Sequence, residues 1–112
     1  MITRLITEFG QGTSIRREDP TAAAERAVRD ALWRNSINLA ELFGREKETM
    51  QITVEIGVPG AGQVDVAPIK SAFPYGQVTV EAREGGLRVP RENGSATLIA
   101  TAAISVGLEA LE

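Results

Sequence analysis

Cysteine and histidine are both absent from the 112 residues of the chain. Without them the sequence lacks the usual zinc ligands, a thiol nucleophile, a redox dithiol and the histidine of a Ser-His-Asp triad. Any chemistry has to use carboxylates, arginine, lysine, tyrosine, hydroxyls, amides or backbone groups. We therefore predict no metal site and no cofactor, and the sequence alone identifies no catalytic residue.

Aromatic side chains and basic charge are also scarce, at 4% aromatic residues and a formal net charge of -3. Proteins that bind nucleic acid need a basic surplus for the phosphates or an aromatic platform for the bases. No apolar run approaches the length of a membrane span, and the first ten residues are too polar for a signal peptide. We expect a cytoplasmic protein without nucleic-acid or membrane partners.

The composition is otherwise that of an ordinary globular protein, with 43% hydrophobic and 24% charged residues. The length suits one domain over residues 1–112. Alanine, valine, isoleucine and leucine dominate the apolar content, so small and branched side chains must fill the core. Such a core suits thin, closely packed layers.

Four segments have the patterns of strands. Ile2 to Phe9 is rich in β-branched residues and is followed by glycine. Met50 to Ile56 and Gln77 to Arg83 alternate apolar and polar residues with the period of half-buried strands. Ala96 to Val106 is almost wholly small or branched and apolar, which predicts a central strand buried on both faces.

Two helices are predicted between these strands. Asp19-Pro20-Thr21 is typical of a helix start, and apolar residues then recur at helical spacing to about Asn35. A further helical turn is expected over Leu39 to Phe43. Val66, Ile69 and Phe73 fit one face of a second short helix that ends before Pro74.

The resulting order is β-α-β-α-β-β, a single α+β domain with a four-stranded mixed sheet. Right-handed crossovers put both helices on one face of that sheet. The opposite face is either covered by another subunit or exposed to solvent. Glu84-Gly85-Gly86 is interpreted as a hairpin turn, Leu87 to Pro90 as a short returning piece, and Arg91 to Ser95 as a second polar turn.

Four stretches, in this order along the chain, resemble a known family: EFGQGTSIRREDPTAAAERAVRDALWRNS, IGVP, PYGQVTVEAREGGLRVP and ATAAISVGL. The family is the Lin family of uncharacterised conserved hypothetical bacterial proteins, and the resemblance covers nearly the whole chain. It implies a fold like the C-terminal domain of tubulin and FtsZ, or like chorismate-mutase-like sheets. It carries over no catalytic residues.

The loop expected after the first strand is the main candidate for a binding site. Ligands favour the junction between a strand end and a helix start. Helix-start amides, together with Arg16 and Arg17, are suited to hold a carboxylate or phosphate. The alternative is a tight turn followed by a capped helix. The candidate ligand-binding residues are Glu8, Gln11, Thr13, Arg16, Arg17 and Tyr75.

Two other loops allow both a chemical and a structural interpretation. Gly57 to Gly62 either wraps an anion or forms a plain turn. Tyr75 and Glu84 either share a cleft, in which a desolvated carboxylate acts as a general base, or serve only in turns. Arg26 and Asp30 lie one helical turn apart and are expected to pair on a solvated face.

Two hypotheses for the function follow. The first is a homo-oligomeric enzyme or binder of a small polar or anionic metabolite, with its pocket at a subunit interface. The second is a structural or interaction module without chemistry, in which the apolar strand and the alanine-rich helix serve assembly alone. Whether the protein is an enzyme stays open at this point.

Overall fold

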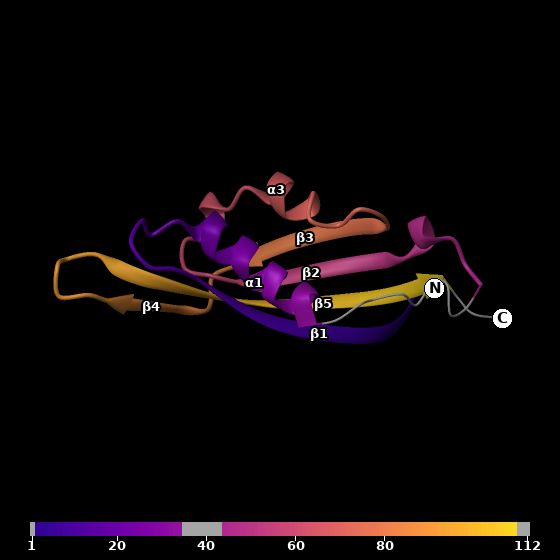
Figure 1. Ribbon diagram of the computed structural model, residues 1–112, viewed down its shortest axis with the longest axis horizontal. Coiled ribbons are helices and arrows are strands. Elements are labelled where there is room, and N and C mark those ends of the chain that lie inside the picture. The colour runs from indigo at the N-terminus through magenta and orange to yellow at the C-terminus, as the bar shows by residue number, and fades with distance from the viewer. Residues whose placement is uncertain (1, 35–43, 110–112) are drawn as a thin grey trace.

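A computed structural model describes residues 2–34 and 44–109 and contains one mixed sheet of five strands (Figure 1). Among these residues, two helices and two short 3-10 turns accompany the sheet. Their bounds are β1 Ile2–Ser14, α1 Pro20–Arg34, η1 Lys47–Thr49, β2 Gln51–Gly57, η2 Ala61–Gln63, α3 Val66–Lys70, β3 Gln77–Arg83, β4 Leu87–Pro90 and β5 Ala96–Glu109. The predicted α+β class is confirmed, and the piece Leu87–Pro90 adds a fifth strand to the four expected.

The strand order is β1-β5-β2-β3, and β4 also pairs with β5. β5 is antiparallel to β1, β2 and β4, whereas β2 and β3 run parallel. The last strand is therefore central, as its apolar composition predicts.

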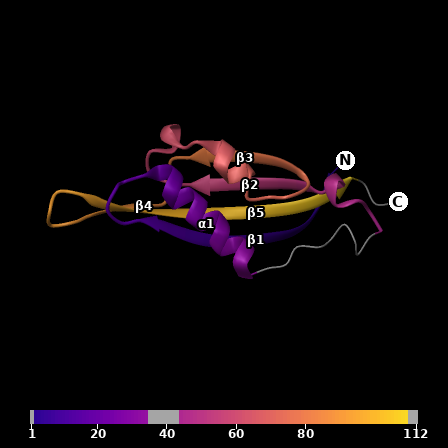
Figure 2. The same ribbon diagram turned by 45° about the horizontal axis from the view of Figure 1, so that its top comes forward.

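Both helices lie on the same face of the sheet, with α1 crossing β1 and β5 and α3 lying near β3 (Figure 2). Ala27 and Ala31 of α1 are fully buried against the sheet, and Ile69 of α3 is 1% exposed. The inward residues of the central strands complete this core: Ile52, Val54, Ile56, Leu98, Ala100, Ala102, Ile104, Val106 and Leu108. Alternation along β2 and β5 places every second residue on this face.

β1 is longer than predicted, since it continues through Gly10 and Gly12 to Ser14. The prediction of a loop at these glycines is therefore wrong, and neither glycine has a positive φ. A Cβ at Gly10 would lie 2.3 Å from the carbonyl oxygen of Ala27, and one at Gly12 would lie 2.2 Å from the Ala27 nitrogen. The glycines serve close helix–strand packing rather than a turn.

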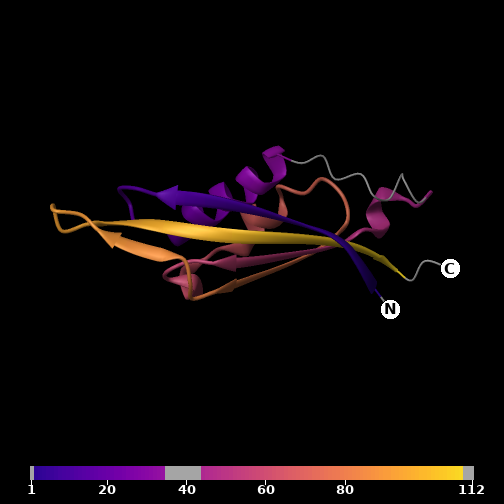
Figure 3. The same cartoon turned by 90° about the horizontal axis from the view of Figure 1, so that it is seen from below.

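The helices cover only one face of the sheet, and no described element covers the other (Figure 3). The prediction that the last strand is buried on both faces holds in a single chain for residues 104–108, all of which are buried, and is wrong for the part of the strand before them. On the uncovered face Thr101 is exposed, Ala103 is half-buried, and Phe9 of the neighbouring strand is 64% exposed. Because successive side chains of a strand point to opposite faces, this row of side chains faces solvent or another molecule.

Glu84-Gly85-Gly86 is not a hairpin turn, because β3 pairs with β2 while β4 pairs with β5. The segment instead crosses past the end of β2, where the Cα of Gly57 would lie 3.2 Å from a Cβ added at Gly85. The predicted turn at Arg91 to Ser95 is confirmed, and the Arg91 amide donates to the Ser95 carbonyl at 2.8 Å. This hairpin projects from the sheet (Figure 3). The molecule extends 57 × 24 × 19 Å along its principal axes.

The first helix is described as far as Arg34, and its predicted end at about Asn35 lies outside the described residues. The helical turn expected over Leu39 to Phe43 lies outside the described residues. Within residues 2–34 and 44–109, no helix is long and apolar enough to cross a membrane.

Candidate functional site

A hollow of about 570 Å³ lies where the end of β1, the following loop and the start of α1 meet. We call it the arginine hollow. It is lined by Thr13, Ser14, Ile15, Arg16, Arg17, Asp19, Ala22 and Arg26.

Local hydrogen bonds set the shape of its helical wall. The Asp19 amide donates to Ser14 Oγ at 3.0 Å, and Asp19 Oδ1 accepts from the Ala22 amide at 3.2 Å. Pro20 is the first helical residue, where a missing amide costs nothing. The predicted helix start is confirmed, and the carboxylate in the hollow is engaged as the helix cap.

Long-range contacts hold the loop that carries the arginines. Arg88 of β4 donates to Glu18 Oε1 at 2.8 Å, and Arg91 donates to the Ile15 carbonyl at 3.0 Å. Glu18 has a φ of 47°, a conformation that costs a non-glycine residue about 1–3 kcal/mol and needs support from its surroundings. The projecting hairpin therefore fixes the loop, a role that sequence reasoning missed because these partners lie far apart in the chain.

The hollow has an excess of positive charge. Neither Arg16 nor Arg17 has a hydrogen bond or ion pair to another described residue. The third arginine, Arg26, donates to the carbonyl of Thr13. Since Asp19 is the sole acidic lining residue, the two free guanidinium groups face a site that is short of negative charge.

The structure brings together three of the six residues predicted to bind a ligand, namely Thr13, Arg16 and Arg17. Gln11 lies two residues earlier, and its amide donates to Asp30 Oδ2 at 2.9 Å. Glu8 lies in mid-strand opposite Ile104. β1 extends past its predicted end, so these two residues belong to the strand and not to the loop.

Tyr75 lies at the far end of the sheet from the arginine hollow. It precedes β3, whose first residue aligns through β2 with Gly107, whereas Ser14 pairs with Leu98. Nine residues of β5 separate these two levels, which is roughly 30 Å along the strand. The residue therefore cannot share a small ligand with Arg16 and Arg17.

The loop from Gly57 to Gly62 binds the carboxylate of Glu84, a residue of the same chain. The Ala61 amide donates to Glu84 Oε1 at 2.8 Å, and the Gly60 amide donates to Oε2 at 3.3 Å. The seven residues of β3 separate Glu84 from Tyr75 by roughly 23 Å. The two side chains therefore do not form the shared cleft considered from the sequence.

Arg26 and Asp30, expected as a pair on α1, both contact β1 instead. Arg26 donates to the carbonyl of Thr13, and Asp30 accepts from the amide of Gln11. They bind backbone groups on the outer edge of the sheet. Their role in the structure is to join the helix to that edge.

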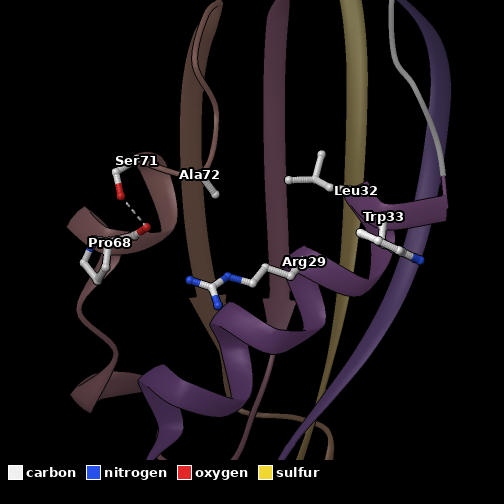
Figure 4. A pocket seen from close by; sticks show the side chains of 6 residues that line it. All are labelled: Arg29, Leu32, Trp33, Pro68, Ser71 and Ala72. Atoms are coloured by element: carbon white, nitrogen blue, oxygen red, sulfur yellow. Dashed lines mark hydrogen bonds between the residues drawn. The ribbon is translucent and has the colours of Figure 1, made fainter.

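A second hollow, of about 480 Å³, lies between α1 and α3 (Figure 4). Arg29 extends from α1 into the gap between the helices, while the ring of Trp33 points away and is 91% exposed. Arg29 lies 3.7 Å from Glu25, which partly neutralises it. The remaining lining residues are Leu32, Pro68, Ser71 and Ala72, so this hollow offers few groups to fix a polar ligand.

A third hollow, of about 270 Å³, opens on the uncovered face of the sheet above Gly107. Arg4, Gln51 and Thr53 contribute its polar groups, together with Ser105, whose hydroxyl lies 3.2 Å from Thr7 Oγ1. It holds a single arginine. The arginine hollow is thus the described site with the largest concentration of one charge.

Comparison with known proteins agrees with the fold. The family model of the conserved hypothetical proteins designated Lin0512 matches residues 4–106. The crystal structure of an FtsZ-like protein of unknown function from Nostoc punctiforme superposes with a TM-score of 0.89 at 33% identity, covering 97% of this chain and 98% of that chain. No curated protein matches the sequence. The resemblance predicted from the sequence is confirmed, and the chain belongs to the Lin0512 family of conserved hypothetical proteins.

Proposed function

We propose that the protein binds a small anionic molecule in the arginine hollow, and that it does so as a homo-oligomer. The observation that carries the binding proposal is the pair of unpartnered arginines, Arg16 and Arg17, beside Arg26 at the start of α1. Guanidinium groups bind carboxylate and phosphate oxygens through two parallel hydrogen bonds. The ligand class is therefore a small carboxylate or phosphate.

Two further features favour an anion at this place. The start of a fifteen-residue helix carries a partial positive charge. The loop is also held in place by Arg88 and Arg91, so binding has less chain entropy to remove. A positive cluster of this kind stands out in a chain whose net charge is -3.

The homo-oligomer is supported by the uncovered face of the sheet. Phe9, Leu87 and Val89 project there and are 64%, 62% and 45% exposed. Exposed apolar groups gathered on one face are typical of interaction surfaces.

The binding proposal is tested by isothermal titration calorimetry with inorganic phosphate and with citrate. We expect Arg17→Ala to lower the affinity at least tenfold, because a hydrogen bond to a charged group contributes about 1.5–3 kcal/mol. Arg29→Ala is the matched control, since it removes an exposed arginine of α1 that lies outside the hollow. Binding should also weaken as salt is added.

Equal affinities of the wild type and Arg17→Ala would contradict the assignment of the site. Equal losses in Arg17→Ala and Arg29→Ala would point to nonspecific attraction. The exposed apolar groups favour a second candidate function, a module that only assembles. That function predicts a stable oligomer that binds neither phosphate nor citrate.

A further inference from the structure

Within the described residues the sheet has three outer edges, at β1, β4 and β3. Two of these edges are blocked against pairing with a further strand. At β1 the outward amide of Gln11 and the outward carbonyl of Thr13 are bound by α1 side chains. The register of β1 also shifts between Arg4 and Ile6. β4 has only four residues and ends in Pro90. Bulges, proline and side-chain cover are means by which proteins prevent further strand pairing.

The edge of β3 has none of these features. The Gln77 amide donates to the Met50 carbonyl at 2.7 Å, and the Val58 amide donates to the Arg83 carbonyl at 3.0 Å. In a parallel pair these bonds direct every second residue, from Gln77 to Arg83, toward β2. The backbone groups of Val78, Val80 and Ala82 therefore point outward.

These outward groups have no hydrogen-bond partner among the described residues. The register between β2 and β3 runs without a shift over seven residues, and β3 contains neither proline nor lysine. The side chains of Val78 and Val80 are only half-buried at the margin of the core. β3 is thus a straight edge with unsatisfied backbone and incompletely covered apolar groups.

We propose that a second copy of this chain pairs antiparallel along β3, with Val80 opposite Val80 of the second copy. A two-fold axis at this residue places Val78 opposite Ala82 and uses all three outward residues of each chain, with about six backbone hydrogen bonds. A register centred on Thr79 would bring Ala82 opposite Gly76, whose φ of 97° lies outside the strand conformation.

Charge favours the same register. Glu81 then faces Thr79 of the second copy and Arg83 faces Gln77, so no like charges stand opposite each other. Within each chain Arg83 already pairs with Glu81 at 2.9 Å. A register centred on Glu81 would instead place two carboxylates opposite one another. On the helix face the chosen register brings valine to valine and valine to alanine.

This inference rests on the proposed homo-oligomer and adds a second contact surface, the β3 edge, to the uncovered face that supports that proposal. Pairing at β3 makes one continuous sheet across both copies. The arginine hollow adjoins β1, at the opposite edge, and stays open in each copy. Assembly and anion binding can therefore be measured separately.

The test is native mass spectrometry of the wild type, Val80→Pro and Thr7→Pro over a range of concentrations. Proline at Val80 removes one outward amide and leaves the bonds to β2 intact, so we expect the assembly mass to halve. Thr7→Pro is the matched control, because it removes an outward amide from β1 without touching the exposed apolar groups, and it should keep the wild-type mass. A Val80→Pro protein with the wild-type mass would overturn the proposed edge.

A second variant decides the matter if Val80→Pro does not fold. The chain has no cysteine, so Val80→Cys introduces a single thiol. Directly opposed Cα atoms about 5.5 Å apart are within disulfide range. We expect oxidation to give a covalent dimer with Val80→Cys and none with Thr7→Cys.

The outcomes separate the two proposals. A wild type that is monomeric at every concentration overturns both the homo-oligomer and the β3 edge. An oligomeric wild type whose Val80→Cys variant does not cross-link overturns the edge alone. Phosphate binding, measured by calorimetry on the same samples, reports on the arginine hollow in either case.

Discussion

At Gly10 and Gly12 the absence of a side chain lets α1 lie directly against β1. The nearest atoms to an added Cβ are backbone atoms of the helix, which cannot move aside as a flexible side chain can. The row of alanines on the helix makes the same close approach possible from the other side. Single small residues thus set the spacing between the layers.

Gly12→Ala should lower the free energy of unfolding by about 1–3 kcal/mol, because the whole helix must shift to admit one methyl group. Urea denaturation measures the change. Gly62→Ala is the matched control, since nothing lies within 4 Å of its added Cβ, and it should leave stability nearly unchanged. Equal stability of Gly12→Ala and the wild type would contradict the packing argument.

Glu81 and Arg83 form a pair on the uncovered face. The hydrogen bond from Arg83, and next its positive charge, lower the pKa of Glu81 below its ordinary value. A lowered pKa in the folded state gives a contribution to stability that is present at neutral pH. That contribution is lost as the pH falls through the folded pKa, and it is small because both groups are exposed.

Arg83→Gln should therefore raise the pKa of Glu81 toward its ordinary value. The pH titration of the Glu81 carboxyl carbon, followed by NMR, measures the shift. Arg88→Gln removes an arginine that pairs with Glu18 instead and should leave the Glu81 titration unchanged. If the pKa of Glu81 were the same in Arg83→Gln and the wild type, the pair would not persist in solution.

Among the elements, the β4–β5 hairpin has the most unexpected role. It projects from the sheet, yet Arg88 and Arg91 reach back to the loop that presents the arginines of the hollow. The strained backbone at Glu18 lies in that loop. The hairpin thereby acts as a brace for the candidate site.

Arg88→Ala should weaken phosphate binding about fivefold, because the loop must then be ordered on binding at a cost near 1 kcal/mol. Calorimetry measures the affinity of this variant, of Glu18→Ala and of the double variant. Because both single changes break one contact, their effects should not add. Additive losses would assign the effect of Arg88 to its charge rather than to the brace.

At the scale of the whole molecule, one sheet face and one edge lack cover within residues 2–34 and 44–109. The helices cover the other face, and Asp30 and Arg26 of α1 bind backbone groups at the β1 edge. The arginine hollow and the β3 edge lie at opposite margins of the sheet. The fold therefore keeps a proposed binding site apart from a proposed assembly surface.

The amino-acid sequence by itself determined the local elements. The alternation of Gln77–Arg83 and the cap at Asp19 act between near neighbours, so the strand and the helix start could be predicted. The family could be predicted as well, because the order of its motifs is a property of the sequence.

Only the tertiary structure decided the features that depend on distant partners. β1 runs through Gly12 because a helix packs there, and Glu84 fills the glycine loop because β3 ends beside it. Tyr75 is separated from Arg17 by the length of the sheet, although both flank predicted elements. Such contacts join residues tens of positions apart, and local propensity contains no information about which of them meet.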